Sequence, residues 1–281
     1  MKYLLAISGG IDSVVLLDML VHDGKHELVV AHFDHGIRSD SASDARFVGE
    51  LAQKYHLPFV TKREELGKGV SEERARARRY AFLYTEAEAY QATIVTAHHA
   101  DDIIETIAIN LVRGTGWRGL AVLDTPSVVR PLLHLTKANI RSYARVKRLE
   151  WVEDSTNGET AYLRNRVRRA IATTIPEDRR LQLLEIWHRQ LELKLGIDEE
   201  VHHYIREDGT YGRYFFIEVD PLCAQEILRA LIITKTKESP TRPQLERALI
   251  AIKTARPSTS FEVGGGVSLY FTAHTFLVQT P

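Results

Sequence analysis

The first 112 residues alternate short apolar runs with longer amphipathic stretches, and this alternation constrains the fold more than any other feature. The nearly continuous apolar runs are Tyr3–Ile7, Leu28–Phe33, Pro58–Thr61 and Thr93–Ala97. Such runs are typical of strands in a sheet that helices cover on both faces. The stretches between and after them predict helices over Asp12–His22, Ser41–Tyr55, Ser71–Tyr90 and Asp101–Val112. This order predicts a doubly wound α/β domain with a mainly parallel sheet and right-handed crossovers.

The rhythm changes after Gly119, where strands no longer alternate with helices. Two basic helical patterns and one long amphipathic pattern follow, over Thr136–Leu149, Ala161–Thr174 and Arg179–Leu195. The remaining patterns predict a small α+β unit that ends in a β-hairpin around Gly264, Gly265 and Gly266. We therefore expect two domains: residues 1–190, which end in the basic helical tail, and residues 200–281.

Length and composition restrict the protein class. The chain has 281 residues, of which 44% are hydrophobic, and it contains no apolar run of the ~18 residues that a membrane span needs. The apolar run near Met1 is shorter than the ~7–15 residues of a secretory signal. Cys223 is the only cysteine, which excludes an internal disulfide and cysteine-rich zinc modules. We expect a cytoplasmic protein with no membrane partner, and the sequence leaves a homodimer open.

Charge is unevenly distributed although the formal net charge is zero. Residues 113–169 carry 12 Lys and Arg against 5 Asp and Glu, an excess of 7 positive charges. Such a segment attracts a polyanion, or else it forms the solvated faces of basic helices. Composition alone leaves both interpretations open.

The turn after the first predicted strand has the composition of a phosphate-binding loop. It consists of Ser8, Gly9, Gly10, Ile11, Asp12 and Ser13. Two glycines permit a tight turn, and the amide groups at the start of the next helix attract phosphate oxygens. The nucleotide-binding patterns G-x-x-x-x-G-K-[ST] and G-x-G-x-x-G are both absent, so the loop has no lysine of its own.

Charged side chains follow two further strands. Asp34 and His35 come after the second strand, where they could bind a metal, act as a base or bind an α-phosphate, or could satisfy loop backbone groups. His98, Asp101, Asp102 and Glu105 come after the fourth strand. Carboxylates three and four residues apart share one side of a helix. Their oxygens suit Mg²⁺, although acidic residues also stabilise a helix N-terminus without any metal.

Taken in order, these strings resemble the tRNA(Ile)-lysidine synthases, a family within the N-type ATP pyrophosphatases (PP-loop superfamily). The matching strings are Ser8–Ser13 (SGGIDS), His32–Arg38 (HFDHGIR), Ala97–Thr106 (AHHADDIIET), Arg113–Gly116 (RGTG), Glu72–Tyr80 (EERARARRY), Arg130–Leu133 (RPLL), Glu153–Asn157 (EDSTN) and Arg164–Arg168 (RNRVR). The resemblance implies a Rossmann-like fold over residues 3–170. It also implies that ATP adenylylates the wobble cytidine of an isoleucine tRNA with a CAU anticodon. The amine of L-lysine then displaces AMP to give lysidine.

The resemblance suggests a role for each residue. ATP would bind Ser8, Gly9, Gly10, Ile11, Asp12, Ser13, His98 and Asp101, and Mg²⁺ would bind Asp12 and Asp102. Arg113 would meet a phosphate or charge that develops on the cytosine. The proton of the attacking lysine would pass to one of Asp34, His35, Glu153 and Asp154.

The basic segment would contact tRNA phosphates through Arg141, Arg145, Arg148, Arg164 and Arg168, with Arg74 and Arg78 as a further pair. The small second domain could also contact tRNA. Three alternatives remain: a tRNA thiolase with the same loop, another amide-forming ligase of the superfamily, and a non-catalytic tRNA-binding protein. A thiolase commonly needs one or more active-site cysteines or a cysteine-bound cluster, and Cys223, alone and far from the loop in the second domain, argues against it.

Overall fold

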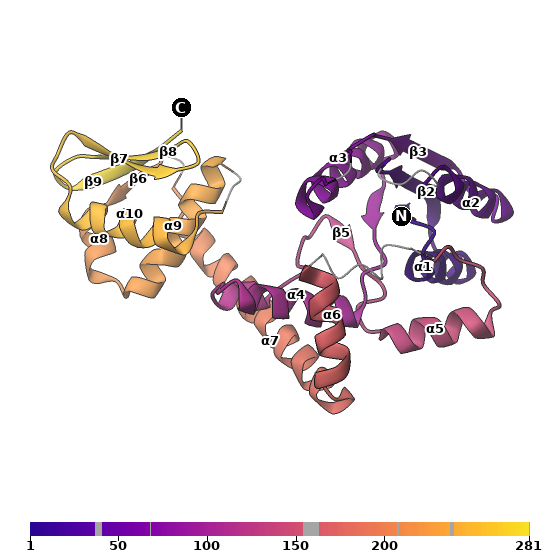
Figure 1. Ribbon diagram of the computed structural model, residues 1–281. Coiled ribbons are helices and arrows are strands. Elements are labelled where there is room, and N and C mark those ends of the chain that lie inside the picture. Colours follow the sequence, from indigo (N-terminus) through magenta and orange to yellow (C-terminus); the bar gives the residue numbers. More distant parts are fainter. Residues whose placement is uncertain (37–40, 68, 154–162, 207, 237–238, 281) are drawn as a thin grey trace. The chain divides into compact units, whose positions relative to one another are not determined.

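The computed structural model describes residues 1–36, 41–67, 69–153, 163–206, 208–236 and 239–280. The chain forms two compact units, Met1–Leu191 and Glu192–Pro281. Helix α7 (Glu177–His202) contains the boundary, so one continuous helix contributes residues to both units (Figure 1). In the described part of the chain, no helix combines the length and the apolar composition that a membrane crossing requires.

A parallel sheet forms the centre of the first unit. Its strands are β1 (Lys2–Ala6), β2 (Glu27–Asp34), β3 (Phe59–Arg63), β4 (Thr93–Val95) and β5 (Val128–Val129). Within the described residues they follow the order β3-β2-β1-β4-β5, and every neighbouring pair is parallel. The doubly wound α/β prediction is therefore confirmed. Strand β5 was not predicted, because it has two residues and stands between Pro126 and Pro131.

Alternate residues of β1 and β2 supply two hydrophobic cores, one on each face of the sheet. Leu5, Ile7 and Val30 pack with α1 (Ile11–Asp23), α2 (Ser41–Lys54) and α5 (Lys137–Val146). On the other face, Leu4, Val29 and Ala31 pack with α3 (Glu72–Tyr90). Both faces are covered, which is why the middle of each strand, residues 4–6 of β1 and 28–31 of β2, is apolar.

A third cluster fixes the helices that follow β4. Ile103 and Ile107 of α4 (Ala100–Val112) pack with Val122 and with Trp187 of α7. The indole N–H of Trp187 donates a 2.9 Å hydrogen bond to the backbone oxygen of Val122. The short 3₁₀ helix Trp117–Leu120 and helix α6 (Leu163–Thr174) complete the unit. The first part of α7 is thus a component of the first unit's core.

The buried carboxylate of Asp18 joins three helices on the α1 face. Its two oxygens accept hydrogen bonds from the hydroxyls of Tyr55 (2.6 Å) and Tyr143 (2.9 Å). Burial, together with this hydrogen bond, raises the pKa of Tyr143 to about 12. These bonds hold α2 and α5 against α1. They therefore fix the position of Lys137, the first residue of α5.

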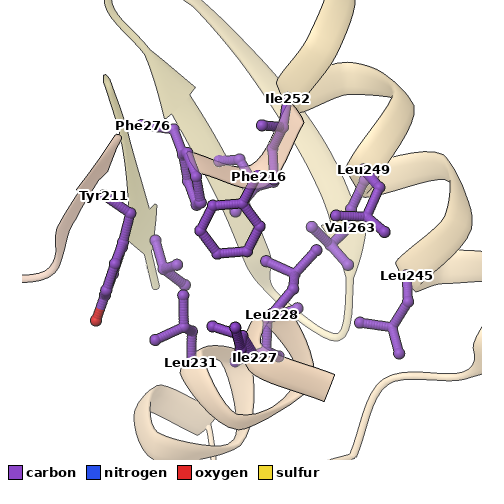
Figure 2. Close-up of a cluster of buried hydrophobic side chains, with 14 of the residues drawn as sticks. Tyr211, Phe216, Ile227, Leu228, Leu231, Leu245, Leu249, Ile252, Val263 and Phe276 are labelled. Carbon is purple, nitrogen blue, oxygen red and sulfur yellow. The ribbon is translucent and has the colours of Figure 1, made fainter. Parts of the chain in front are cut away.

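The second unit is a small α+β domain with a four-stranded antiparallel sheet in the described residues, in the order β6-β9-β8-β7. Phe216, Leu228, Leu249 and Phe276 lie at its centre (Figure 2). The predicted hairpin is confirmed, and Gly265 and Gly266 form its turn with positive φ. The elements are β6 (Thr210–Gly212), α8 (Arg213–Glu218), α9 (Pro221–Thr236), α10 (Arg242–Thr254), β7 (Thr259–Gly264), β8 (Val267–Phe271) and β9 (Thr275–Gln279).

Candidate active site

The strand order reverses at the carboxyl ends of β1 and β4, and we call the region beyond these two strand ends the crevice. After β1 the chain crosses to β2 on one side, whereas β4 pairs with β1 on the other side. This reversal of strand order is the position at which doubly wound folds bind ligands. Ser8–Ser13 follows β1, and His98–Asp102 follows β4. The topology therefore brings together two of the segments that the sequence singled out.

The Ser8–Ser13 loop is braced from within by its two serine hydroxyls, which accept hydrogen bonds from the backbone N–H groups of Ser8 and Gly10. Ser13 Oγ donates to the backbone oxygen of Gly10 (2.8 Å) and accepts from the backbone N–H of Ser8 (3.2 Å). Helix α1 begins at Ile11, and the capping residue Gly10 has no side chain with which to close the helix end. The first amides of α1 therefore remain available to an anion.

Gly9 lets this loop turn against its surroundings. Its φ of +90° is one that a residue with a Cβ rarely adopts, and an added Cβ would lie 3.5 Å from Phe47 and Val48. The Gly9 oxygen accepts a 2.9 Å hydrogen bond from the backbone N–H of Val152. This bond holds the segment that carries Glu153 beside the loop.

Three carboxylates surround His99 at the start of α4. His99 Nδ1 lies 3.5 Å from Asp101, and Nε2 lies 3.6 Å from Asp102 and 3.8 Å from Asp12. Burial alone would lower the pKa of His99, but Asp101, Asp102 and Asp12 together raise it. Burial likewise opposes ionisation of Asp101, yet His99 and the backbone N–H of Lys137 lower its pKa to about 2. The imidazole thus links the acidic groups of the two loops.

Lys137 contacts both loops and was not predicted as a site residue. Its ammonium donates a 2.5 Å hydrogen bond to Asp12 Oδ1, and its backbone N–H donates a 2.7 Å bond to Asp101 Oδ2. Its contact with Asp12 spans 125 sequence positions, so no local pattern could reveal it. The useful signal was its position directly after Thr136, the capping residue of α5. The first residue of that helix points into the crevice.

Two arginines complete the ion-pair network. Arg168 binds buried Glu105 through two hydrogen bonds, of 2.6 and 3.0 Å, and lies 3.9 Å from Asp102. Its bond to Glu105 raises the pKa of Arg168. Arg180 Nη1 lies 3.4 Å from Asp101. Some of the basic residues of segment 113–169 thus form ion pairs inside the first unit. Arg168, which the sequence suggested as a tRNA contact, is bound by Glu105.

His98 lies in a different environment from its neighbour His99. Its Nδ1 is 2.8 Å from Thr96 Oγ1. Burial, assisted by Arg76 and Arg130, lowers the pKa of His98 to about 3, so the ring is neutral at physiological pH. Arg76 lies over the ring of Tyr80, 5.0 Å from its centre. This basic surrounding suits an anion, and the sequence alone did not indicate it.

Other predicted site residues are not brought together with this cluster. Buried Asp34 is engaged by the Gly36 N–H (2.9 Å) and by Arg63 (3.2 Å). His35 packs edge-on against Phe33, and burial lowers its pKa. Exposed Arg113 caps the far end of α4, about 18 Å along the helix axis from Asp101 at 1.5 Å per residue. Asp154 lies outside the described residues.

The family model for the PP-loop domain matches residues 1–175 of this chain. The chain belongs to the PP-loop family. The U34-tRNA thiolase NcsA from Methanococcus maripaludis has a related fold, with a TM-score of 0.56, 16% sequence identity, and coverage of 68% of this chain and 72% of that chain.

Curated relatives of this PP-loop protein carry the name tRNA(Ile)-lysidine synthase. The protein of Solibacter usitatus is 37% identical over 79% of this chain and 48% of its own length. That of Geobacter sulfurreducens is 41% identical over 59% of this chain and 38% of its own length. That of Thermotoga maritima is 30% identical over 90% of this chain and 65% of its own length. The chain thus spans about a third to two thirds of the length of these relatives.

The residues of this PP-loop site fit a nucleotide with a Mg²⁺ ion. Open amides and glycine backbone at Ser8–Ser13 suit phosphate oxygens. Within the described residues, no group of three or more His, Cys, Asp and Glu side chains forms an enclosed metal site. Mg²⁺ is commonly held by one or two carboxylates together with substrate phosphates, and Asp12 and Asp102 are the carboxylates of this site that would take that role. Their oxygens would share the metal with the phosphates of ATP.

Proposed function

We propose that this PP-loop protein is a tRNA(Ile)-lysidine synthase. ATP transfers its adenylyl group to the C2 oxygen of the wobble cytidine in isoleucine tRNA with a CAU anticodon, and pyrophosphate leaves. The uncharged amine of L-lysine then attacks C2, the C–O bond to AMP breaks, and the lysine nitrogen loses its extra proton. The observation that carries the proposal is the Asp12–His99–Asp101 cluster, which adjoins the phosphate loop at the reversal of strand order.

In the first step, the transfer of the adenylyl group, each residue around the loop would have a different role. The amides and hydroxyls of Ser8–Ser13 would bind the β- and γ-phosphates, the group that leaves. When bound, Mg²⁺ would neutralise phosphate charge, with Asp12 and Asp102 as its protein ligands. Asp101 would hold His99 and the start of α5 in place. Neutral His98, among Arg76 and Arg130, would face the remaining phosphate.

Glu153 is the favoured acceptor for the lysine ammonium or its proton. Val152, the residue before it, is bonded to Gly9 of the loop, which supports a position beside the reacting phosphates. Asp34 is a weaker candidate because Arg63 and Gly36 already occupy its oxygens. Asp154 and His35 remain alternatives to Glu153. We propose Arg113 as a contact to a tRNA phosphate away from the loop.

The tRNA would lie along exposed basic side chains. Arg141, Arg145 and Arg148 are exposed on or directly after α5, the helix whose first residue reaches the loop. Arg78 is a weaker candidate, because Glu64 binds it through two hydrogen bonds of 2.7 and 3.0 Å. The second unit would provide further tRNA contacts. An iron–sulfur thiolase is disfavoured, since clusters are held by several cysteines and this chain has one, exposed Cys223.

A transfer assay tests this function. Purified protein is mixed with unmodified isoleucine tRNA (CAU anticodon), ATP, Mg²⁺ and radiolabelled L-lysine, with an elongator methionine tRNA in parallel. We expect label in the isoleucine tRNA and none with the Asp12→Ala variant. Label in both tRNAs would still support the lysine-transfer reaction. It would also mean that this chain alone does not discriminate isoleucine tRNA from methionine tRNA. Cleavage of ATP to AMP in the presence of tRNA but without lysine transfer would contradict the proposed nucleophile.

A further inference from the structure

The phosphate loop contains no lysine, but the fold brings one to it from a distant helix. Lys137 begins α5, and Asp101 holds its backbone N–H at the tip of β4. The side chain extends to Asp12 in the first turn of α1, beside the open amides of the loop. The two anchoring carboxylates come from different sides of the crevice. Lys137 is therefore held at the position where an anion on the loop would need a cation.

The ion pair between Lys137 and Asp12 is suited to exchange its partner. The two side chains are 32% and 31% exposed, and ion pairs that water reaches contribute little to stability. A polyphosphate carries several negative charges, whereas Asp12 carries one. Only the ammonium needs to move, because α5 itself is fixed by the Tyr143–Asp18 hydrogen bond and by the Asp101 contact.

We infer that Lys137 is the phosphate-binding lysine of this site. Its ammonium pairs with Asp12 in the free protein and with a pyrophosphate oxygen of the nucleotide in the bound protein. The exchange releases the Asp12 carboxylate from its ion pair when the polyphosphate binds. This inference rests only on the ATP-binding part of the proposed function. It does not depend on lysine or tRNA as substrates.

The test measures binding of inorganic pyrophosphate to the full chain by calorimetry, in EDTA so that no metal contributes. The variants are Lys137→Gln and Lys137→Arg, with Lys147→Gln as the matched control. Lys147 caps the other end of α5, is exposed and lies over the Tyr143 ring, 5.9 Å from its centre. We expect Lys137→Gln to weaken binding about 10-fold or more, as loss of a charge-assisted hydrogen bond predicts. Lys137→Arg should retain most of the affinity, and the control should change it less than about twofold.

Asp12→Asn provides a second readout through its coupling to Lys137, which a double-mutant cycle measures. Removing the competing carboxylate should tighten metal-free pyrophosphate binding, and the gain should shrink when Lys137 is also Gln. Wild-type affinity in Lys137→Gln, or equal losses in Lys137→Gln and Lys147→Gln, would overturn the inference. If Lys137→Gln fails to fold, unchanged affinity in Asp12→Asn would overturn it. Loss of pyrophosphate binding in Lys137→Gln would support the inference even if the transfer assay found no lysine in tRNA.

Discussion

Ionised side chains at the crevice make the stability of the fold depend on pH, and Asp101 is the clearest case. It accepts a backbone hydrogen bond from Lys137 and lies within 3.5 Å of His99 and 3.4 Å of Arg180. These partners lower the pKa of Asp101 from 3.8 to about 2. Because the folded-state pKa is depressed, the stabilisation is present above pH ~4 and is lost as pH falls toward 2. We expect Asp101→Asn to reduce the free energy of unfolding by about 2 kcal/mol at pH 7.

Chemical denaturation at a series of pH values between 7 and 3 measures this effect. The difference between Asp101→Asn and the wild type should shrink as pH falls below ~4.5, where the wild-type carboxylate begins to take up its proton. Asp178→Asn is the control, since Asp178 is 73% exposed and only 4.0 Å from Arg179. Its effect should stay within about 0.5 kcal/mol. A difference for Asp101→Asn that does not vary with pH would contradict the assigned network.

At the scale of elements, buried Arg213 joins α8 to α10 and to the β8–β9 turn. It donates hydrogen bonds to the backbone oxygens of Ile252 (2.7 Å), Ala255 (2.8 Å) and Thr272 (3.1 Å). The two oxygens at the end of α10 are ones that the helix itself cannot satisfy. Lysine cannot reach three carbonyls in this planar arrangement. We expect Arg213→Lys to cost about 2–4 kcal/mol of unfolding free energy.

Hydrogen exchange measured by mass spectrometry localises that loss. Amides of α10 and β8 should exchange faster in Arg213→Lys, while the β1 and β2 amides of the first unit keep their protection. Arg242→Lys is the control, because Arg242 is 72% exposed and pairs with Glu246 one helical turn away. Equal deprotection in both variants would refute the structural role of Arg213.

The elements themselves were largely predictable, because hydrophobic periodicity is a local property. The strands β1 to β4 and the helices between them follow from apolar runs that a two-sided core requires. Strand β5 was not predicted, because two residues are too few to show a hydrophobic period. In the second unit, the Gly264–Gly266 turn indicated the hairpin, but nothing local showed that β6 would pair with β9, more than 60 positions later.

For the molecule as a whole, the candidate site was predictable in its loops and not in its ion pairs. Strand order alone brings Ser8–Ser13 to His98–Asp102. The contact of Lys137 with Asp12 and that of Arg168 with Glu105 depend on packing between distant helices. The basic residues of segment 113–169 therefore fall into two groups that composition could not distinguish. Some cations neutralise the crevice, and others remain on the surface.

The surface cations lead to a prediction about tRNA binding. Arg141, Arg145 and Arg148 are exposed, so a variant with all three changed to Gln should bind tRNA more weakly. Each lost phosphate contact lowers the slope of log affinity against log salt by about 0.7–0.9, so we expect a decrease of about 2–3. Filter binding of isoleucine tRNA at several salt concentrations measures the slope, and pyrophosphate affinity should stay unchanged.

The matched control changes the net charge equally at cations that already have carboxylate partners. The control substitutions are Lys2→Gln, Lys25→Gln and Arg179→Gln. The carboxylates of Glu27, Asp23 and Asp178 lie 3.3, 2.6 and 4.0 Å from these three cations. If tRNA binding responds only to total charge, this variant and the α5 variant will lose the same slope. If α5 positions the tRNA backbone, only the α5 variant will lose it, because phosphate contacts release counterions where they form. The second outcome would show that the helix that delivers Lys137 to the phosphate loop also presents the RNA to it.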